Sequence, residues 1–193
     1  SGATALTYLD CYNNQLTSLD VSANMALTDL RCNNNQLTSL NVSGATALTR
    51  LLCDNNQLTS LNVSANMALT TLSCDNNQLT SLNVSANTAL SQLICSNNQL
   101  TSLNVSANSD LTYFGCENNQ LTSLNVQNGN NTNFMLFIAT NNPNLTCIQV
   151  DNAAYMNANW SGGKDAIASF SENCGVVGID DINNHAFAIY PNP

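Results

Sequence analysis

Apolar residues recur along this chain in an order that repeats every 21 residues. In one copy they are Leu27, Leu30, Cys32, Leu37, Leu40 and Val42. Apolar and polar residues alternate from position 30 to 32, which is typical of a short strand with one buried face. The same alternation from 40 to 42 predicts an extended segment on the opposite wall of the turn. One such unit cannot bury its apolar side alone, so the pattern predicts stacked units that share a parallel sheet.

The repeat is marked by a cysteine in six consecutive copies, at Cys11, Cys32, Cys53, Cys74, Cys95 and Cys116. Around each cysteine lies the frame L-x-x-L-x-C-x-N-N-Q-L-T-S-L-x-V, in which Phe114 replaces one leucine. This frame resembles the leucine-rich repeat family, whose pattern L-x-x-L-x-L-x-x-N/C-x-L it matches. The resemblance implies a leucine-rich repeat solenoid. Its concave face would carry a parallel β-sheet, and its convex face would be extended, 3₁₀ or turn structure.

The frame predicts three parts of the chain. Residues 1–133 hold six regular repeats, and residues 134–175 hold a looser seventh repeat and a C-terminal cap. Residues 176–193 are predicted to be a linker and the start of a secretion sorting domain. The opening Ser1–Leu6 duplicates Ser43–Leu48, so we expect the chain to begin within a repeat. An open N-terminal layer would then allow end-to-end association.

Two cysteines, Cys147 and Cys174, fall outside the 21-residue rhythm. They bracket a stretch that has lost the repeat. We expect them to form a disulfide that fastens the cap and stabilises it by about 3 kcal/mol. The six cysteines in the frame stand where the family has leucine, so we expect buried thiols, although strand spacing leaves disulfide pairing between neighbours open. The expected cap core is Tyr155, Trp160, Ile167 and Phe170.

Two stretches near the C-terminus resemble parts of secreted proteins. Asn142–Asp151 together with Phe170–Cys174 is similar to the end module of Bacteroidetes-type leucine-rich repeat proteins. His185–Pro193 resembles the opening of the C-terminal sorting domain of the type IX secretion system, with its Tyr-Pro-Asn-Pro stretch. These resemblances imply a protein secreted by, or displayed on the outer surface of, a Gram-negative bacterium. The alternative is an ordinary polar tail.

One asparagine recurs at the ninth position of the frame, at Asn14, Asn35, Asn56, Asn77, Asn98 and Asn119. A buried amide without a partner would be costly. In the family this asparagine points inward and bonds backbone groups of neighbouring turns. The resemblance therefore implies a structural asparagine ladder.

Variation between the copies concentrates at the third, fifth and seventh positions of the frame. These positions alternate with buried Leu and Cys, so they point outward, and in the family that concave face carries the ligand. The expected ligand-binding residues are Tyr8, Asp10, Tyr12, Asp29, Arg31, Arg50, Leu52, Asp54, Thr71, Asp75, Gln92, Ile94, Tyr113 and Glu117. Tyr and Arg are common in the centres of interfaces. Leu52 and Ile94 are expected to form an exposed apolar spot. Drift at unconstrained positions is the alternative explanation of the variation.

Composition and charge exclude several functions. The net charge is −9 with three basic residues, which argues against binding to nucleic acid. The chain has no apolar run of about 18 residues, so the sequence predicts no membrane span. The chain has no Gly-rich phosphate loop and no H-E-x-x-H motif, and its one histidine, His185, lies in the tail. We therefore expect neither an enzyme nor a cofactor or metal site, and we interpret Asp54 and Asp75 as a solvated acidic pair.

Three functions remain. The first is a binding module that recognises a protein or a glycan with its concave face. The second is a passive spacer or adhesin stalk for an N-terminal part that is missing. The third follows from polar residues that repeat unchanged at outward positions, such as Asn55, Gln57, Thr59 and Ser60. A regular Thr and Asn array of this kind would meet ice or a polysaccharide.

Overall fold

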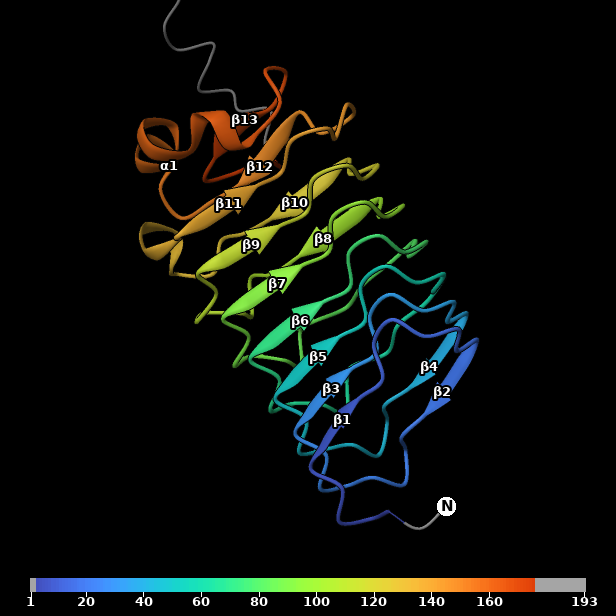
Figure 1. The fold of residues 1–193 in the computed structure, drawn as a ribbon. Helices are drawn as coiled ribbons and strands as arrows, with labels where there is room; N and C mark the ends of the chain where they lie inside the picture. The colour runs from blue at the N-terminus through green and yellow to red at the C-terminus, as the bar shows by residue number, and fades with distance from the viewer. Residues whose placement is uncertain (1–2, 176–193) are drawn as a thin grey trace, which may run out of the picture.

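The computed structural model describes residues 3–175 and shows a solenoid of parallel turns (Figure 1). The predicted linker and sorting-domain start at 176–193 lie outside the described residues. The first wall of the solenoid is a seven-stranded parallel sheet that takes one strand from each turn. Its strands are β1 (Tyr8–Asp10), β3 (Asp29–Arg31), β5 (Arg50–Leu52), β6 (Thr71–Ser73), β7 (Gln92–Ile94), β9 (Tyr113–Gly115) and β11 (Leu136–Ile138). The expected solenoid with a parallel sheet is confirmed.

The second wall faces the first and contains two smaller parallel sheets (Figure 1). One pairs β2 (Ser18–Asp20) with β4 (Ser39–Asn41). The other contains β8 (Ser102–Asn104), β10 (Ser123–Asn125), β12 (Cys147–Gln149) and β13 (Ser169–Ser171). The sequence predicted extended or turn structure here, and the structure adds strand pairing at both ends of the wall.

The two walls bury columns of identical side chains because the turns stack without a shift in register. Leu30 pairs with Leu51, and Leu51 with Leu72, so each frame leucine lies directly against its counterpart in the next turn. These leucines are fully buried, as is Val63 from the second wall. The core is therefore one continuous column between the walls rather than a set of separate cores.

Backbone hydrogen bonding between neighbouring turns differs between the two walls. The first wall is bonded throughout, whereas the second wall is interrupted between β4 and β8. Val105 N donates to Asn125 O at 2.9 Å, but the backbone N–H groups of Val63 and Val84 have no such partner in the neighbouring turn within residues 3–175. Neighbouring turns are therefore bonded more completely along the seven-stranded sheet than along the second wall.

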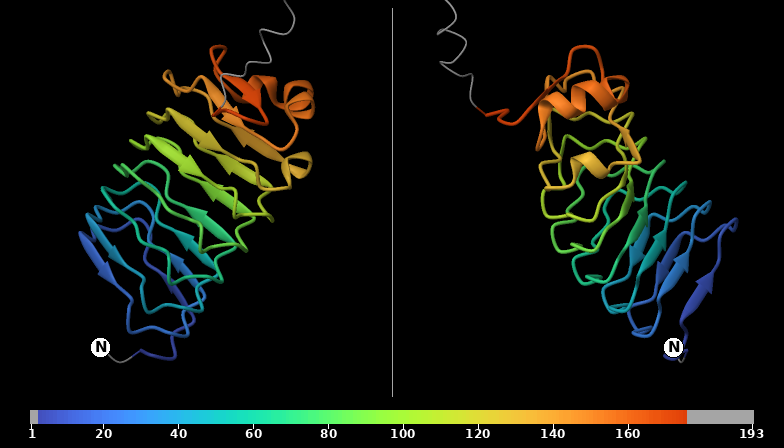
Figure 2. Two further views of the ribbon diagram at one scale, coloured as in Figure 1. Left: turned by 180° about the vertical axis from the view of Figure 1, so that it is seen from behind. Right: turned by 90° about the vertical axis from the view of Figure 1, so that its left-hand side faces the viewer.

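A cap closes the C-terminal end of the stack (Figure 2). It contains helix α1 (Ala153–Trp160), two 3₁₀ turns (Asn131–Asn133 and Ser161–Gly163) and β13. The side chain of Asn152 begins the helix by accepting a hydrogen bond from Tyr155 N at 2.9 Å. Within the described residues, no helix combines the length and hydrophobicity needed to cross a bilayer.

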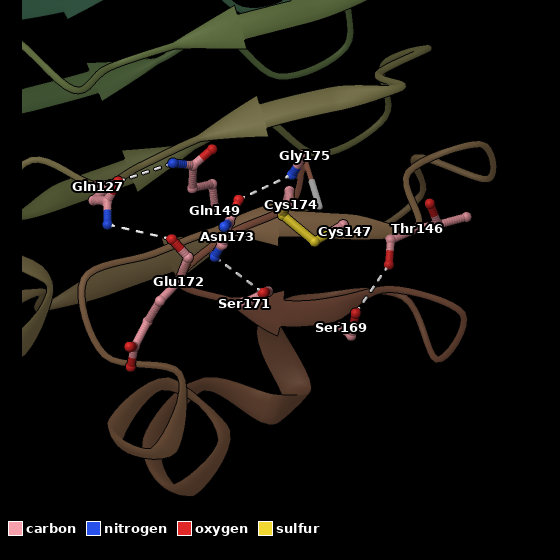
Figure 3. The surroundings of a disulfide bond; sticks show 10 residues. All are labelled: Gln127, Thr146, Cys147, Gln149, Ser169, Ser171, Glu172, Asn173, Cys174 and Gly175. Carbon is pink, nitrogen blue, oxygen red and sulfur yellow. Dashed lines mark hydrogen bonds between the residues drawn. A yellow bond between two sulfur atoms is a disulfide. The ribbon is translucent and has the colours of Figure 1, made fainter. Parts of the chain in front are cut away.

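The disulfide between Cys147 and Cys174 is confirmed (Figure 3). Cys147 belongs to β12, which pairs with β13, and Cys174 follows β13 by three residues. The bond therefore ties the end of the described chain back to the second wall. Ser169 on β13 adds a hydrogen bond to Thr146 O at 3.2 Å.

The expectation that Ile167 belongs to the cap core is wrong, because 62% of this residue is exposed. Ala168 and Phe170 are buried and Ser169 is exposed, so the alternation along this segment turns Ile167 outward. Met156, on α1, is fully buried and belongs to the core, although the sequence did not predict it there. Tyr155 and Trp160 are half-buried and pack against this core.

Candidate binding face

The outer surface of the seven-stranded sheet carries the residues at the third, fifth and seventh positions of the frame, where the variation between copies concentrates. They project from this surface because they alternate with the buried Leu and Cys columns. None of the expected ligand-binding residues is buried. The exposed fractions of Tyr8, Tyr12 and Tyr113 are 45%, 48% and 42%. The predicted residues therefore share one surface, which we call the variable face.

A cluster of aromatic and charged side chains occupies the N-terminal part of the variable face. The Tyr8 hydroxyl donates to Asp10 Oδ2 at 2.8 Å, and this hydrogen bond raises the pKa of Tyr8. The guanidinium carbon of Arg31 lies 5.3 Å from the centre of the Tyr8 ring. Arg31 also donates to both carboxylate oxygens of Asp29, at 3.3 and 3.1 Å. The tyrosine ring and the guanidinium are thus held in a fixed arrangement on the surface.

A hollow of about 280 Å³ adjoins this cluster. Its lining combines a carboxylate, a phenol, a guanidinium, an amide and an aliphatic side chain, from Asp10, Tyr12, Arg31, Asn33 and Leu52. Such a mixture offers hydrogen bonds of both kinds beside apolar contact, which suits a side chain or a sugar of a partner molecule.

The expected exposed apolar spot is not formed as predicted, because Leu52 and Ile94 are both half-buried. A Cβ at Gly115 would lie 3.3 Å from Ile94 Cδ1, so Ile94 leans over a neighbour that has no side chain. The two residues provide apolar contact within the sheet surface rather than a projecting patch.

Carboxylates follow one another along the central and C-terminal part of the variable face. Ser73 donates to Asp75 Oδ1 at 2.7 Å, and Ser96 donates to Glu117 Oε2 at 2.5 Å. Burial raises the pKa of Asp54, and the negative charge of Asp75 adds to that shift. No group of three or more metal-ligating side chains occurs within residues 3–175. Both arginines of the variable face therefore lie in its N-terminal half, and Asp54, Asp75 and Glu117 add carboxylates farther along the solenoid.

The asparagine at the ninth frame position bonds the backbone of two turns. Asn77 Nδ2 donates to the carbonyl oxygens of Cys53, Cys74 and Asp75 at 3.0, 3.1 and 3.2 Å. Its Oδ1 accepts from Leu58 N at 2.9 Å. The same type of interturn bond is made by Asn35, Asn56, Asn98, Asn119 and Asn142. Asn14, in the first described turn, bonds carbonyls of its own turn.

A second buried asparagine ladder was not predicted. Asn66, Asn87 and Asn108 are fully buried on the side of the core near the second wall. Asn87 Nδ2 donates to Val63 O at 3.0 Å and to Asn66 O at 2.8 Å. The recurring Ser-Ala-Asn triplet was the available signal, but Ala45 replaces the asparagine in one copy and hides the regularity.

Another invariant asparagine is explained by its backbone conformation. Asn55 has a φ of 54°, in the left-handed region that asparagine tolerates better than most residues. Its counterparts with positive φ are Asn13, Asn34, Asn76, Asn97, Asn118 and Asn141. The repetition of Asn55 is therefore a requirement of the turn, not evidence of an outward-facing array.

The frame cysteines form a column of free thiols within the core. Cys32, Cys53, Cys74, Cys95 and Cys116 are buried, and Cys11 in the first turn is half-buried. Burial raises the pKa of Cys32 to about 12 and raises the pKa of Cys53 well above its ordinary value. These thiols are therefore protonated at neutral pH and act as small apolar side chains.

The rate at which the thiols react with a reagent tests whether this column is buried. We expect an aromatic disulfide reagent at pH 8 to react with Cys11 first, because the reactive thiolate is scarce at the buried positions. In guanidinium chloride all six thiols should react. Rapid reaction of the five buried thiols in the native protein would contradict the buried column.

Stacked turns, buried leucine columns and an asparagine ladder define a leucine-rich repeat solenoid, a fold typical of protein-binding modules. No protein-family profile matches the chain, and no curated protein sequence does. The functional domain of InlJ from Listeria monocytogenes, described as including a cysteine ladder, is 38% identical over 76% of this chain, with a TM-score of 0.66. The leucine-rich repeat protein LIC12759 from Leptospira interrogans is 19% identical over 87% of the chain, with a TM-score of 0.57.

Internalin C2 from Listeria monocytogenes has the same fold, with 19% identity over 86% of this chain, 80% of its own length covered and a TM-score of 0.53. The chain spans 35% of the InlJ structure and 49% of the LIC12759 structure. The similarity to InlJ extends to its described cysteine ladder, since this chain also stacks one frame cysteine per turn.

Proposed function

We propose that this protein is a non-enzymatic binding module that recognises a protein or a glycan through the variable face. One observation carries the proposal. The side chains on this face differ from turn to turn, while the frame that supports them is nearly constant. A fixed scaffold with a changing surface is what recognition of one particular partner requires.

The Tyr8–Arg31 cluster is the proposed centre of the contact. Tyrosine and arginine are enriched among residues that contribute most to binding. The cation–π contact and the Asp29 carboxylate hold both side chains in place, so little conformational entropy is lost on binding. Arg50, an exposed cation on the neighbouring strand β5, extends this centre toward an acidic group of the partner.

We place the protein outside the cell, secreted or on the outer surface of a Gram-negative bacterium. The Cys147–Cys174 disulfide fits an oxidising compartment. The resemblance of His185–Pro193 to a type IX sorting domain points the same way. Cell fractionation of the source bacterium with an antibody to the repeats tests this placement, and a purely cytoplasmic protein would contradict it.

Binding is tested with a glycan array and an extract of host or environmental proteins. The variant carries Tyr8→Ser, Arg31→Ser and Leu52→Ser, which removes the ring, the cation and an apolar wall of the hollow. We expect binding to weaken about 30-fold, the effect of losing one residue that contributes 2 kcal/mol. The control carries Met25→Ser and Met67→Ser, which are 66% exposed and lie outside both walls.

Two results would contradict the proposal. Unchanged binding of the Tyr8, Arg31 and Leu52 variant would move the site elsewhere on the molecule. Absence of binding on both panels would favour the passive spacer.

A further inference from the structure

Three columns of exposed polar side chains follow the edge between the two walls. In the third repeat they are represented by Gln57, Thr59 and Ser60, and the same residue types recur at every 21-residue step in all six regular repeats. Every member of the three columns is exposed. We call these columns the polar edge. Neighbouring members of a column are one turn apart, a distance of about 4.8 Å where the turns pair as parallel strands.

Many other recurring polar residues have a role inside the molecule. Asn55 has a left-handed backbone, and Asn56 belongs to the ladder. Asn62 Oδ1 accepts from Ser64 N at 3.0 Å and shapes the turn that follows the second wall. The Thr49 hydroxyl donates to Thr28 O at 3.0 Å and links two turns. The internal contacts of these residues therefore explain why they recur between the copies.

The polar edge has almost no such internal role. Within residues 3–175, the Gln57 and Ser60 side chains and their counterparts in the other five repeats make no hydrogen bond. In the threonine column, only Thr38 and Thr122 donate, each to a carbonyl oxygen of the preceding turn at 3.2 Å. The donors and acceptors of the polar edge are therefore left to solvent or to a partner.

Recent duplication of the repeat and free drift are two explanations for this regularity. Both can be tested by comparing the polar edge with the variable face on the same turns. On the variable face, Arg50 is followed one turn later by Thr71 and then by Gln92. Over the same turns the polar edge does not change at all. Recent duplication would have kept both surfaces alike, and free drift would have altered both. The constancy of the polar edge alone indicates a constraint from outside the fold.

A groove of about 390 Å³ on the second wall begins at the serine column. Ser102 and Ser123 belong to its lining, together with Asn83, Asn104, Asn125 and Gln149. The apolar part of the lining is Leu82, Leu103 and Ala107, and no charged side chain takes part. The groove and the polar edge together form a surface of hydroxyls and amides that spans several turns.

We propose that the polar edge and this groove bind a neutral polysaccharide in an extended conformation. Hydroxyls and amides donate and accept, as sugar hydroxyls do. The partner is uncharged, because this surface has no basic residue and the net charge of −9 would repel an anionic polymer. Each contact is weak, and the affinity arises from repetition of the same contact along the stacked turns. The proposal concerns a different surface from the variable face and does not depend on it.

The test is depletion of the purified protein by insoluble cellulose, chitin, xylan and β-1,3-glucan. The edge variant carries Gln57→Ala, Gln78→Ala, Gln99→Ala, Ser60→Ala, Ser81→Ala and Ser102→Ala. The control carries Thr46→Ala, Thr88→Ala and Ser109→Ala, which removes exposed hydroxyls that lie outside the polar edge, the groove and the variable face. We expect the wild type and the control to bind at least one polysaccharide equally and the edge variant to bind at least tenfold more weakly. The melting temperature of the edge variant should equal that of the wild type.

Several outcomes would overturn the proposal. The wild type could bind none of the four polysaccharides. The variant with Tyr8→Ser, Arg31→Ser and Leu52→Ser could lose polysaccharide binding while the edge variant keeps it, which would assign the glycan to the variable face. A lower melting temperature of the edge variant, with unchanged binding of the folded fraction, would make the columns a structural ladder. Arrest of ice growth by the wild type, without any polysaccharide binding, would assign the array to an ice lattice.

Discussion

Replacing Phe137 with alanine is expected to lower the free energy of unfolding by about 4 kcal/mol. Phe137 is 1% exposed and connects the last repeat to the cap. Its ring centre lies 5.9 Å from Phe114 and 5.6 Å from Phe134 on the repeat side. On the cap side it lies 5.7 Å from Phe170 and 6.5 Å from Trp160. Truncation leaves a cavity that none of these rigid rings can fill.

Chemical denaturation monitored by circular dichroism measures this loss. The matched control is Met135→Ala, two residues earlier, because Met135 is 67% exposed. Its effect should stay within about 0.5 kcal/mol, as for surface substitutions in general. Similar losses in both variants would show that the aromatic cluster does not secure the cap.

Replacing Asn77 with alanine is expected to lower the free energy of unfolding by about 3 kcal/mol. The change removes the bond to Leu58 N and leaves three carbonyl oxygens near the core without their amide donor. Each buried polar group left without a partner costs about 1–3 kcal/mol, and partial hydration of the turn offsets some of the sum. Because every turn depends on its neighbours, the loss should also reduce the cooperativity of unfolding.

The matched control for this ladder position is Asn83→Ala. Asn83 is exposed and its side chain accepts one hydrogen bond, from Ser85 N at 3.0 Å. Its replacement should cost about 1 kcal/mol or less, the typical net value of one hydrogen bond. If Asn77→Ala were no more destabilising than Asn83→Ala, the ladder would not be a main support of the stack.

Much of the candidate site could be located before the structure, since alternation about Leu30 and Cys32 places Arg31 on the outer surface. The contacts between side chains within that surface could not be predicted from the sequence. The Tyr8–Arg31 contact joins residues 23 positions apart in the chain, and it depends on the register between β1 and β3. The half-burial of Ile94 depends on the absent side chain of Gly115, which lies across from it on the next strand.

The repeat period and the buried columns follow from the sequence alone, because identical units stacked in register must bring identical residues together. The Cys147–Cys174 bond could also be predicted, because these two cysteines fall outside the repeat and bracket the cap. The interrupted pairing of the second wall, the second asparagine ladder and the left-handed turn at Asn55 emerge only in three dimensions. The first two depend on how closely neighbouring turns approach on each wall. The third is a backbone conformation that asparagine tolerates but that its identity does not dictate. In this chain backbone bonding is complete along the seven-stranded sheet and interrupted on the second wall between β4 and β8.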